Sequence, residues 1–313
     1  MKASKLLIIA IAAIASLFTA CTAEEEDYPA KRELVIQVGI NGTRATPDNT
    51  WSVGDYIAVQ VGGAVKKYII TDLSGKAVGA DAANTFYWDE LGVSSVKVSA
   101  WSFGGKFVSS LEDSITVVAD QSNYDNYKAN DFIYAKQTTI KQGETGTLTF
   151  YHQMARINFN IKVEDANESV SSMTFGFGKE DYSSPLMKAK FIYADTLSNY
   201  GWFEFDDEFM ETDKVIPYKE DSAPTGFNVS YSAILIPITI EGAYYEIKTS
   251  DGTNETRYPI DSWSLVSNNP NDPNSNGLYY EPGHEYTVNI TIRNKQLIIG
   301  NGKTAVTVND WIE

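Results

Sequence analysis

The chain of 313 residues carries 41 acidic and 25 basic side chains, and its formal net charge is −16 at pH 7. Such an acidic surface repels phosphate backbones and anionic lipid head groups, which argues against nucleic-acid binding and against membrane attachment through basic residues. The length allows two domains with separate cores. The 19 tyrosines and 14 phenylalanines, with frequent valine, isoleucine and threonine, favour strands.

The first twenty residues have the pattern of a secretory signal peptide. Lys2 and Lys5 precede an apolar run over residues 6–15, and small residues precede the expected cut. The run is shorter than the roughly 20 apolar residues that a permanent membrane-spanning helix requires. We therefore expect residues 1–20 to be removed by cleavage between Ala20 and Cys21.

Cys21 is the only cysteine in the chain, and its position directly after the expected cut indicates a lipoprotein. Its thiol would take a diacylglycerol, and this use would leave the exported chain without any disulfide. The alternative is an ordinary cleaved signal followed by an accidental cysteine. Apart from this covalent lipid, we expect no cofactor.

Residues 21–32 form a predicted acidic linker between the lipid and the folded chain. Within it, residues 24–27 read Glu-Glu-Glu-Asp. This run resembles the export signal that sends lipoproteins of the Bacteroidetes through the outer membrane to the cell surface. A solvated linker is the plainer interpretation, and the two are compatible. We expect a lipid-anchored protein of the outer membrane, exposed at the cell surface.

Alternating apolar residues predict a series of short strands from residue 34 onwards. Leu34, Ile36, Val38 and Ile40 share one face of the first strand, as in a half-buried strand. Similar patterns predict strands at 57–61, 67–70, 86–88, 96–103, 115–119 and 132–135. Beyond the signal peptide, no long stretch has the helical period of 3.6 residues.

The segment 148–163 changes its buried face part of the way along. Apolar residues occupy even positions up to Met154 and odd positions from Ile157 onwards. A strand that changes its buried face needs a bulge or a crossing from one sheet to another, which is typical of β-sandwiches. His152 lies on the first of these faces, and we predict a hydrogen-bonded core histidine there.

The polar run 164–169 marks a predicted domain boundary. We assign residues 33–164 to an N-terminal domain and residues 165–313 to a C-terminal domain. Further strands are predicted at 170–177, 188–194, 202–205, 215–218, 227–238, 244–248, 256–260, 286–292 and 305–311. Short strands separated by turn residues predict an all-β protein built of β-sandwiches.

The sequence offers little for catalysis. His152 and His284 are the only histidines, and the single cysteine is expected to carry the lipid. No nucleophile elbow, phosphate-binding glycine loop or His-Glu-x-x-His motif occurs. Nothing singles out a carboxylate pair for glycoside hydrolysis. We predict that the protein is not an enzyme and has neither catalytic residues nor a metal site.

Several segments resemble the fimbrillin-like lipoproteins of Bacteroidetes in order and spacing. They are Thr43–Thr46, Trp51–Val59, Asp120–Ser122, Asn130–Ala135 and Leu148–Ile157, with Cys21 before them and Trp311 closing the last strand. The resemblance is specific over residues 21–165 and weaker beyond. It implies two tandem transthyretin-like β-sandwich domains with Greek-key connections. It also implies a cell-surface pilus subunit or adhesin that mediates attachment, without distinguishing stalk, anchor and tip.

The resemblance further implies assembly by strand exchange. A trypsin-like protease would cut between Arg44 and Ala45 and remove the first strand, and a strand of a neighbouring subunit would fill the groove. The candidate donors are residues 296–299 and 305–311, with Ala305, Val306, Val308 and Trp311 as the donor residues of the second.

The implied partners are other pilus subunits or copies of this chain, the outer membrane through the lipid, and a host or bacterial surface ligand. Two alternatives to the processing step stay open. Residues 34–40 could form a permanent strand, with Arg44 as an ordinary loop residue. A cut at Lys31-Arg32 is the other, and it would leave the first strand in place.

The alternative function is a glycan-binding surface lipoprotein of a carbohydrate-uptake system. Such proteins capture glycans with exposed aromatic side chains, and the chain has six tryptophans, at positions 51, 88, 101, 202, 263 and 311. Most are expected in the core, because aromatic side chains dominate burial. Trp202 and Trp263 lie nearest to loops. A flat patch of exposed aromatic rings would favour glycan capture, and a buried set would favour a pilus subunit.

Overall fold

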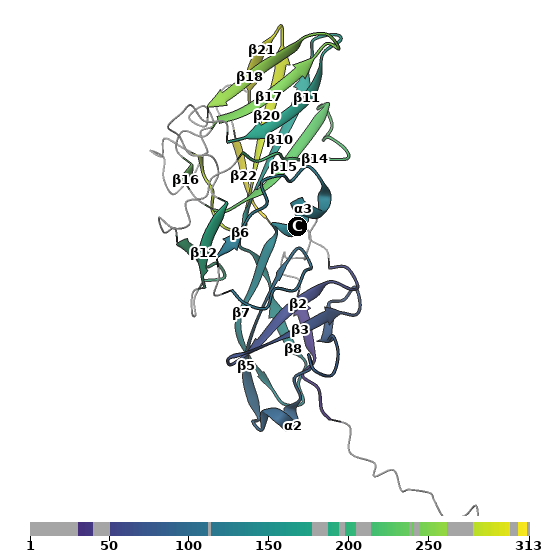
Figure 1. Ribbon diagram of the computed structural model, residues 1–313, viewed down its shortest axis with the longest axis vertical. Coiled ribbons are helices and arrows are strands. Elements are labelled where there is room, and N and C mark those ends of the chain that lie inside the picture. The colour runs from purple at the N-terminus through teal and green to yellow at the C-terminus, as the bar shows by residue number, and fades with distance from the viewer. Residues whose placement is uncertain are drawn as a thin grey trace, which may run out of the picture. The chain divides into compact units, whose positions relative to one another are not determined.

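A computed structural model gives the fold of the chain, which divides into two units, residues 1–32 and 33–313. The structure describes residues 31–39, 51–111, 114–176, 187–193, 198–204, 214–237, 239–240, 244–261, 278–300 and 306–311. Strands make up most of the regular structure in the second unit, which confirms the prediction of an all-β protein (Figure 1). The tandem sandwich arrangement stays a prediction.

The largest sheet has eight strands in the order β8-β1-β4-β3-β2-β5-β7-β9. Its neighbours are antiparallel except for β1 and β8, which run parallel. The strands are β1 (Ile36–Gly39), β2 (Tyr56–Val61), β3 (Ala64–Ile70), β4 (Lys76–Gly79), β5 (Ser95–Phe103), β7 (Phe132–Lys141), β8 (Gly146–Thr149) and β9 (Tyr151–His152).

A second sheet joins β10 to strands of the second half, in the order β14-β15-β10-β20-β21, with β22 also paired to β20. Figure 1 shows β10, β15 and β20 side by side in this sheet. The strands are β10 (Ala155–Val163), β14 (Tyr218–Lys219), β15 (Val229–Leu235), β20 (His284–Arg293), β21 (Gln296–Ile299) and β22 (Val306–Asp310).

Three smaller sheets complete the described strands, in the orders β11-β17-β18, β13-β12-β6 and β16-β19. Their members are β6 (Ile115–Thr116), β11 (Ser169–Phe175), β12 (Lys188–Ile192), β13 (Trp202–Glu204), β16 (Thr239–Ile240), β17 (Tyr244–Ser250), β18 (Glu255–Asp261) and β19 (Leu278–Tyr279).

The change of buried face predicted within 148–163 is a crossing between sheets. β8 and β9 belong to the eight-stranded sheet, whereas β10 pairs with β15 and β20. The crossing thus follows residue 152, close to the predicted position. β10 precedes the predicted domain boundary yet pairs with strands that follow it. The boundary after residue 164 itself stays a prediction.

Two short helices interrupt the strands, α2 (Trp88–Leu91) and α3 (Tyr124–Ala129). The strand predicted at 86–88 is therefore wrong. Tyr87 is extended, and the helix begins at the next residue and ends at Gly92, whose φ is 65°. The acidic pair Asp89 and Glu90 stabilises the first helical turn, because acidic side chains oppose the positive end of a helix.

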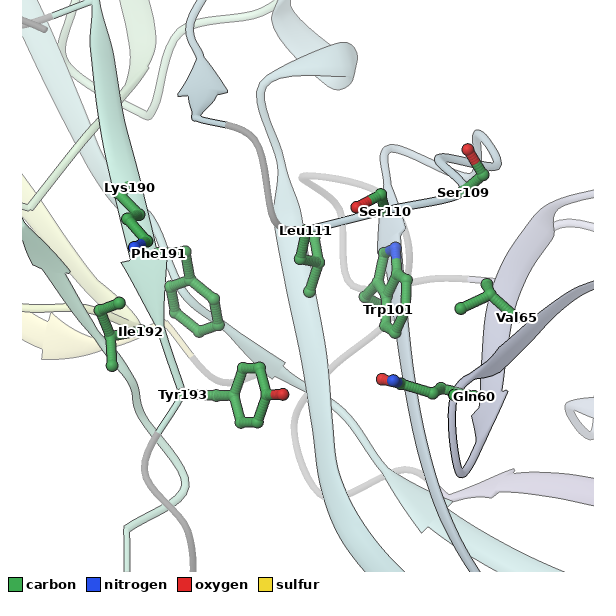
Figure 2. A pocket seen from close by; sticks show the side chains of 11 residues that line it. Gln60, Val65, Trp101, Ser109, Ser110, Leu111, Lys190, Phe191, Ile192 and Tyr193 are labelled. Carbon is green, nitrogen blue, oxygen red and sulfur yellow. The ribbon is translucent and has the colours of Figure 1, made fainter.

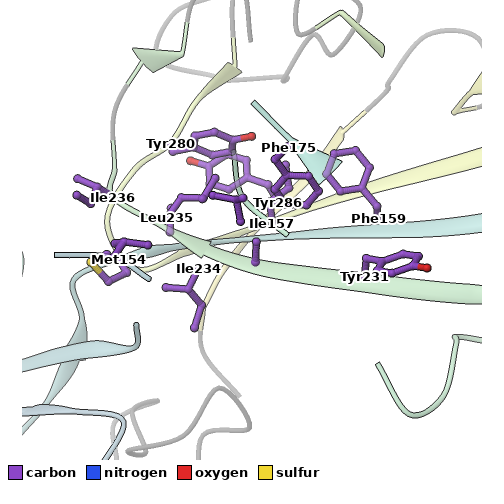
Figure 3. Packing of buried hydrophobic residues seen from close by; sticks show 14 of the residues in the cluster. Met154, Ile157, Phe159, Phe175, Tyr231, Ile234, Leu235, Ile236, Tyr280 and Tyr286 are labelled. Carbon is purple, nitrogen blue, oxygen red and sulfur yellow. The ribbon is translucent and has the colours of Figure 1, made fainter. Parts of the chain in front are cut away.

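Buried apolar residues form two clusters. The first draws only on the chain between Leu34 and Phe150. The second extends from Ala58 to Trp311 and includes the inner faces of β10, β15 and β20. Figure 3 shows part of the second cluster, where the rings of Tyr280 and Tyr286 meet edge to face with centroids 4.9 Å apart. Such contacts add to the stabilisation that burial of the rings provides.

Candidate functional site

β1 lies inside a sheet although it is the first of the strands that the structure describes. Residues 36–39 pair in parallel with residues 146–149 of β8, and residues 36 and 37 pair with 77 and 76 of β4. Further backbone bonds extend this contact, since the N–H of Leu34 donates to the Phe86 carbonyl (2.8 Å) and that of Val38 to the Gly75 carbonyl (2.9 Å). Removal of β1 would therefore leave unpaired backbone groups on both sides of the gap.

The side chains of β1, together with Leu34 just before it, belong to the core of the eight-stranded sheet. Leu34, Ile36 and Val38 are each 0% exposed, while Val35 and Gln37 are half-buried. This alternation confirms the face predicted for these three residues, and Ile40 lies outside the described residues. Burial of such side chains contributes about 1.5–3 kcal/mol each, so the three together account for roughly 5–9 kcal/mol.

Tyr68 of β3 ties the backbone of the first strand to the core. Its buried hydroxyl donates to the Leu34 carbonyl (3.1 Å) and accepts from the Phe86 N–H (3.2 Å). Burial raises the pKa of the Tyr68 phenol above its usual value, so the group remains a donor at all physiological pH values. These two hydrogen bonds hold the backbone at Leu34, just before β1, and the backbone at Phe86 against the same side chain.

The turn that closes over β1 requires glycine. Gly75 has a φ of 90°, and a Cβ there would lie 2.6 Å from the Val38 carbonyl oxygen. Asp72 orders the turn by accepting from the N–H of Ser74 (2.9 Å) and of Lys76 (3.2 Å). Backbone therefore packs closely against backbone where this turn meets Val38 of β1.

The C-terminal strands β21 and β22 both pair with one side of β20. β21 pairs along residues 290–293, and β22 pairs along residues 284–288. Apolar side chains alternate in both, with Leu297 and Ile299 in β21 and Val306 and Val308 in β22 directed to the second core cluster. This spacing of two residues matches the spacing of the side chains that β1 buries.

The residue after β22, Trp311, is packed into the core. It is 2% exposed, its ring stacks on His152 with centroids 3.8 Å apart, and the Arg156 guanidinium lies 5.0 Å from its ring centroid. His152 in turn contacts a buried carboxylate, with Nδ1 2.6 Å from Oδ1 of Asp131. His152 is therefore the hydrogen-bonded core histidine that the sequence predicts.

Several predicted site residues cannot be placed. Ala20, Cys21, Arg44, Ala45 and Ala305 lie outside the described residues. Lipidation, signal cleavage and processing at these positions stay predictions. Among the residues that are described, no three His, Cys, Asp or Glu side chains gather as a metal site would require. None of the described helices has both the length and the apolar character needed to cross a membrane.

Most of the described tryptophans are buried, as expected from the dominance of aromatic side chains in burial. Trp51, Trp88, Trp101 and Trp311 are buried, Trp202 is 50% exposed, and Trp263 lies outside the described residues. Within the described part of the chain, tryptophan thus forms no flat exposed patch. The tryptophans therefore give no support to glycan capture at a flat patch of exposed indole rings.

Two contributors to this region are not predicted from the sequence. Asp131 falls in a segment whose pattern identifies the family, yet no local signal marks it as the partner of His152. β4 was missed because only Ala77 of its four residues is fully buried, which leaves too little alternation to detect. The turn residues Asp72 and Gly75 before it were the available signal.

Comparison with known proteins places these features in a family. The sequence profile of the fimbrillin-like family matches residues 43–311. A candidate cell adhesion protein from Bacteroides uniformis has a similar structure, with a TM-score of 0.60 and 16% identity over 89% of this chain and 99% of that one. One from Bacteroides ovatus has a TM-score of 0.60 and 18% identity over 91% and 99%.

At these identities the two structures show a shared fold. No curated protein matched the sequence. The family profile spans most of the chain, including the first-half segments and the end of the last strand. The chain belongs to the fimbrillin-like family.

Proposed function

We propose that this chain is a non-enzymatic, cell-surface subunit of a pilus, or an adhesin carried on one. A lipid on Cys21 would hold the precursor at the outer membrane. Cleavage between Arg44 and Ala45 would release the first strand, and a strand of another subunit would take its place. The chain would then consist of two tandem β-sandwich domains, with the second core cluster drawing on residues of both.

The observation that carries this proposal is the position of β1. It is the first of the described strands and is held between β8 and β4, and Ile36 and Val38 in it, with Leu34 just before it, are wholly buried. Its loss would expose two strand edges and three adjacent side-chain sites, which another strand with the same alternation could fill. β21 and β22 both offer that alternation, provided that they leave β20 first.

Processing is tested with an arginine-specific protease on the purified precursor. We expect cleavage after Arg44 and a ladder of oligomers that resist dissociation in electrophoresis without boiling. Arg44→Gln should abolish the ladder, because β1 then stays covalently attached. Arg32→Gln is the matched control and should leave the ladder intact, since a cut there does not release β1. Cleavage after Arg44 without any oligomers would contradict strand exchange.

The anchor is tested separately by Cys21→Ser. We expect the wild-type chain to partition with outer-membrane vesicles and the variant to appear in the soluble fraction, because a covalent lipid is the only membrane contact proposed. Metabolic labelling with a fatty-acid analogue should mark the wild type alone. A variant that stays in the membrane fraction would show that attachment has another cause.

A further inference from the structure

A pocket of about 510 Å³ opens between the eight-stranded sheet and β12. Trp101 of β5, Phe191 of β12 and Tyr193 line it, together with Gln60, Ser109 and Lys190. Figure 2 shows the rings of Trp101, Phe191 and Tyr193 around a common space, with the Gln60 amide directed into it. The volume lies in the range of sites that hold small organic ligands, about 300–1,000 Å³.

The aromatic walls are held in place by their neighbours. The Trp101 Nε1–H donates to the Val108 carbonyl (2.8 Å), and Phe191 meets Phe132 edge to face at 4.8 Å. Tyr193 stacks on Tyr134 with centroids 5.5 Å apart and an interplanar angle of 22°, yet it is 51% exposed. A large ring that is both exposed and fixed is a preformed contact surface, which lowers the entropy cost of binding.

The pocket lining also carries an amide, a hydroxyl and an ammonium group, from Gln60, Ser109 and Lys190. Gln60 offers an amide whose oxygen lies 3.4 Å from the Ser99 hydroxyl, which leaves it capacity for a further bond, and Ser109 adds a hydroxyl. An apolar ligand would desolvate these groups without pairing them, which is unfavourable. Lys190, the one charged side chain of the pocket lining, is solvent-exposed, so its ammonium group stays hydrated and needs no anionic partner in the ligand, while the net charge of −16 opposes the approach of anions at long range.

We propose that this pocket binds a neutral saccharide. A pyranose ring has an apolar C–H face that suits the exposed ring of Tyr193, behind which Trp101 and Phe191 are buried, and its hydroxyls both donate and accept hydrogen bonds as the Gln60 amide and the Ser109 hydroxyl require. The inference extends the proposed role in attachment. Saccharide binding rests on the proposed function only for its role in attachment. It is measured on the uncleaved chain, which does not assemble, so a failure to bind sugar would leave the proposal of strand exchange untouched.

The test titrates the uncleaved full chain with glucose, galactose, mannose, fucose, N-acetylglucosamine, N-acetylgalactosamine and their short oligomers. Saturation-transfer NMR detects binding, and calorimetry gives the Kd. We expect at least one neutral sugar to bind, and Tyr193→Ala to weaken it at least about tenfold. Gly63→Phe should also block binding, since Gly63 lines the pocket and a Cβ there meets open space.

Trp202→Ala is the matched control. Trp202 is as exposed as Tyr193 but does not line the pocket, so its loss should leave the Kd unchanged within about twofold. Sialic acid serves as the anionic comparison and should bind more weakly than the best neutral sugar. The proposal is overturned if no neutral sugar binds, if Tyr193→Ala binds as the wild type does, or if Trp202→Ala weakens binding equally.

Discussion

Replacing Ile36 by alanine should lower the free energy of unfolding of the uncleaved chain by about 2–5 kcal/mol, yet leave the melting temperature of the assembled fibre unchanged. The destabilisation follows from the cavity that alanine would leave at a fully buried position between β8 and β4. The loss is large compared with the roughly 5–15 kcal/mol that stabilises a typical folded domain. The fibre should be unaffected because, under strand exchange, β1 is no longer part of it.

Leu148→Ala provides the matched control for this prediction. Leu148 is also 0% exposed, and it pairs with Val38 across the contact between β1 and β8. Because β8 follows the cut and stays in the subunit, its truncation should destabilise the uncleaved chain and the fibre alike. Urea denaturation followed by circular dichroism measures the free energy of unfolding of the uncleaved chain. Thermal melting of purified fibres measures the melting temperature of the fibre.

The comparison of the two variants decides between a removable and a permanent first strand. If Ile36→Ala lowers the fibre's melting temperature as much as Leu148→Ala does, β1 remains in the assembled subunit. Residues 34–40 would then be an ordinary core strand, and the pilus would have to assemble through other contacts. The result is independent of which strand acts as the donor.

The sequence predicts those parts of the fold that depend on local pattern. Leu34, Ile36 and Val38 alternate, and all three face the core. The change of face near residue 155 marks the crossing from β9 to β10, because only a change of sheet or a bulge can reverse the buried side. The strand predicted at 86–88 failed because alternation over three residues does not outweigh the helical turn that follows.

Pairing between distant segments is what the sequence does not predict. Nothing in residues 34–40 indicates that β1 runs parallel to β8 or lies between β8 and β4, since register depends on contacts across the whole sheet. The partners of His152 were missed for the same reason, since Asp131 and Trp311 approach it only in the folded chain. The pocket lined by Gln60, Trp101 and Tyr193 likewise combines segments that share no motif.

Replacing Trp311 by alanine should lower the free energy of unfolding of the uncleaved chain by about 3–5 kcal/mol. The ring is buried, stacks on His152 and lies against Arg156, which itself donates a hydrogen bond to Glu285 of β20. Loss of the indole ring would leave a large cavity between β9, β10 and the end of β22. Chemical denaturation of the variant beside the wild type measures the change.

The same stack opposes any role of β22 as a donor strand, because the strand must release Trp311 before it can enter another subunit. Trp202→Ala is the control for loss of an indole, and at 50% exposure it should change stability by no more than about 0.5 kcal/mol. If Trp311→Ala costs as little as that, the end of β22 is not held in the core in solution and is free to leave. If it costs the expected amount, β22 would have to give up that stabilisation before it could act as a donor, a cost that the proposed donor β21 does not carry through Trp311.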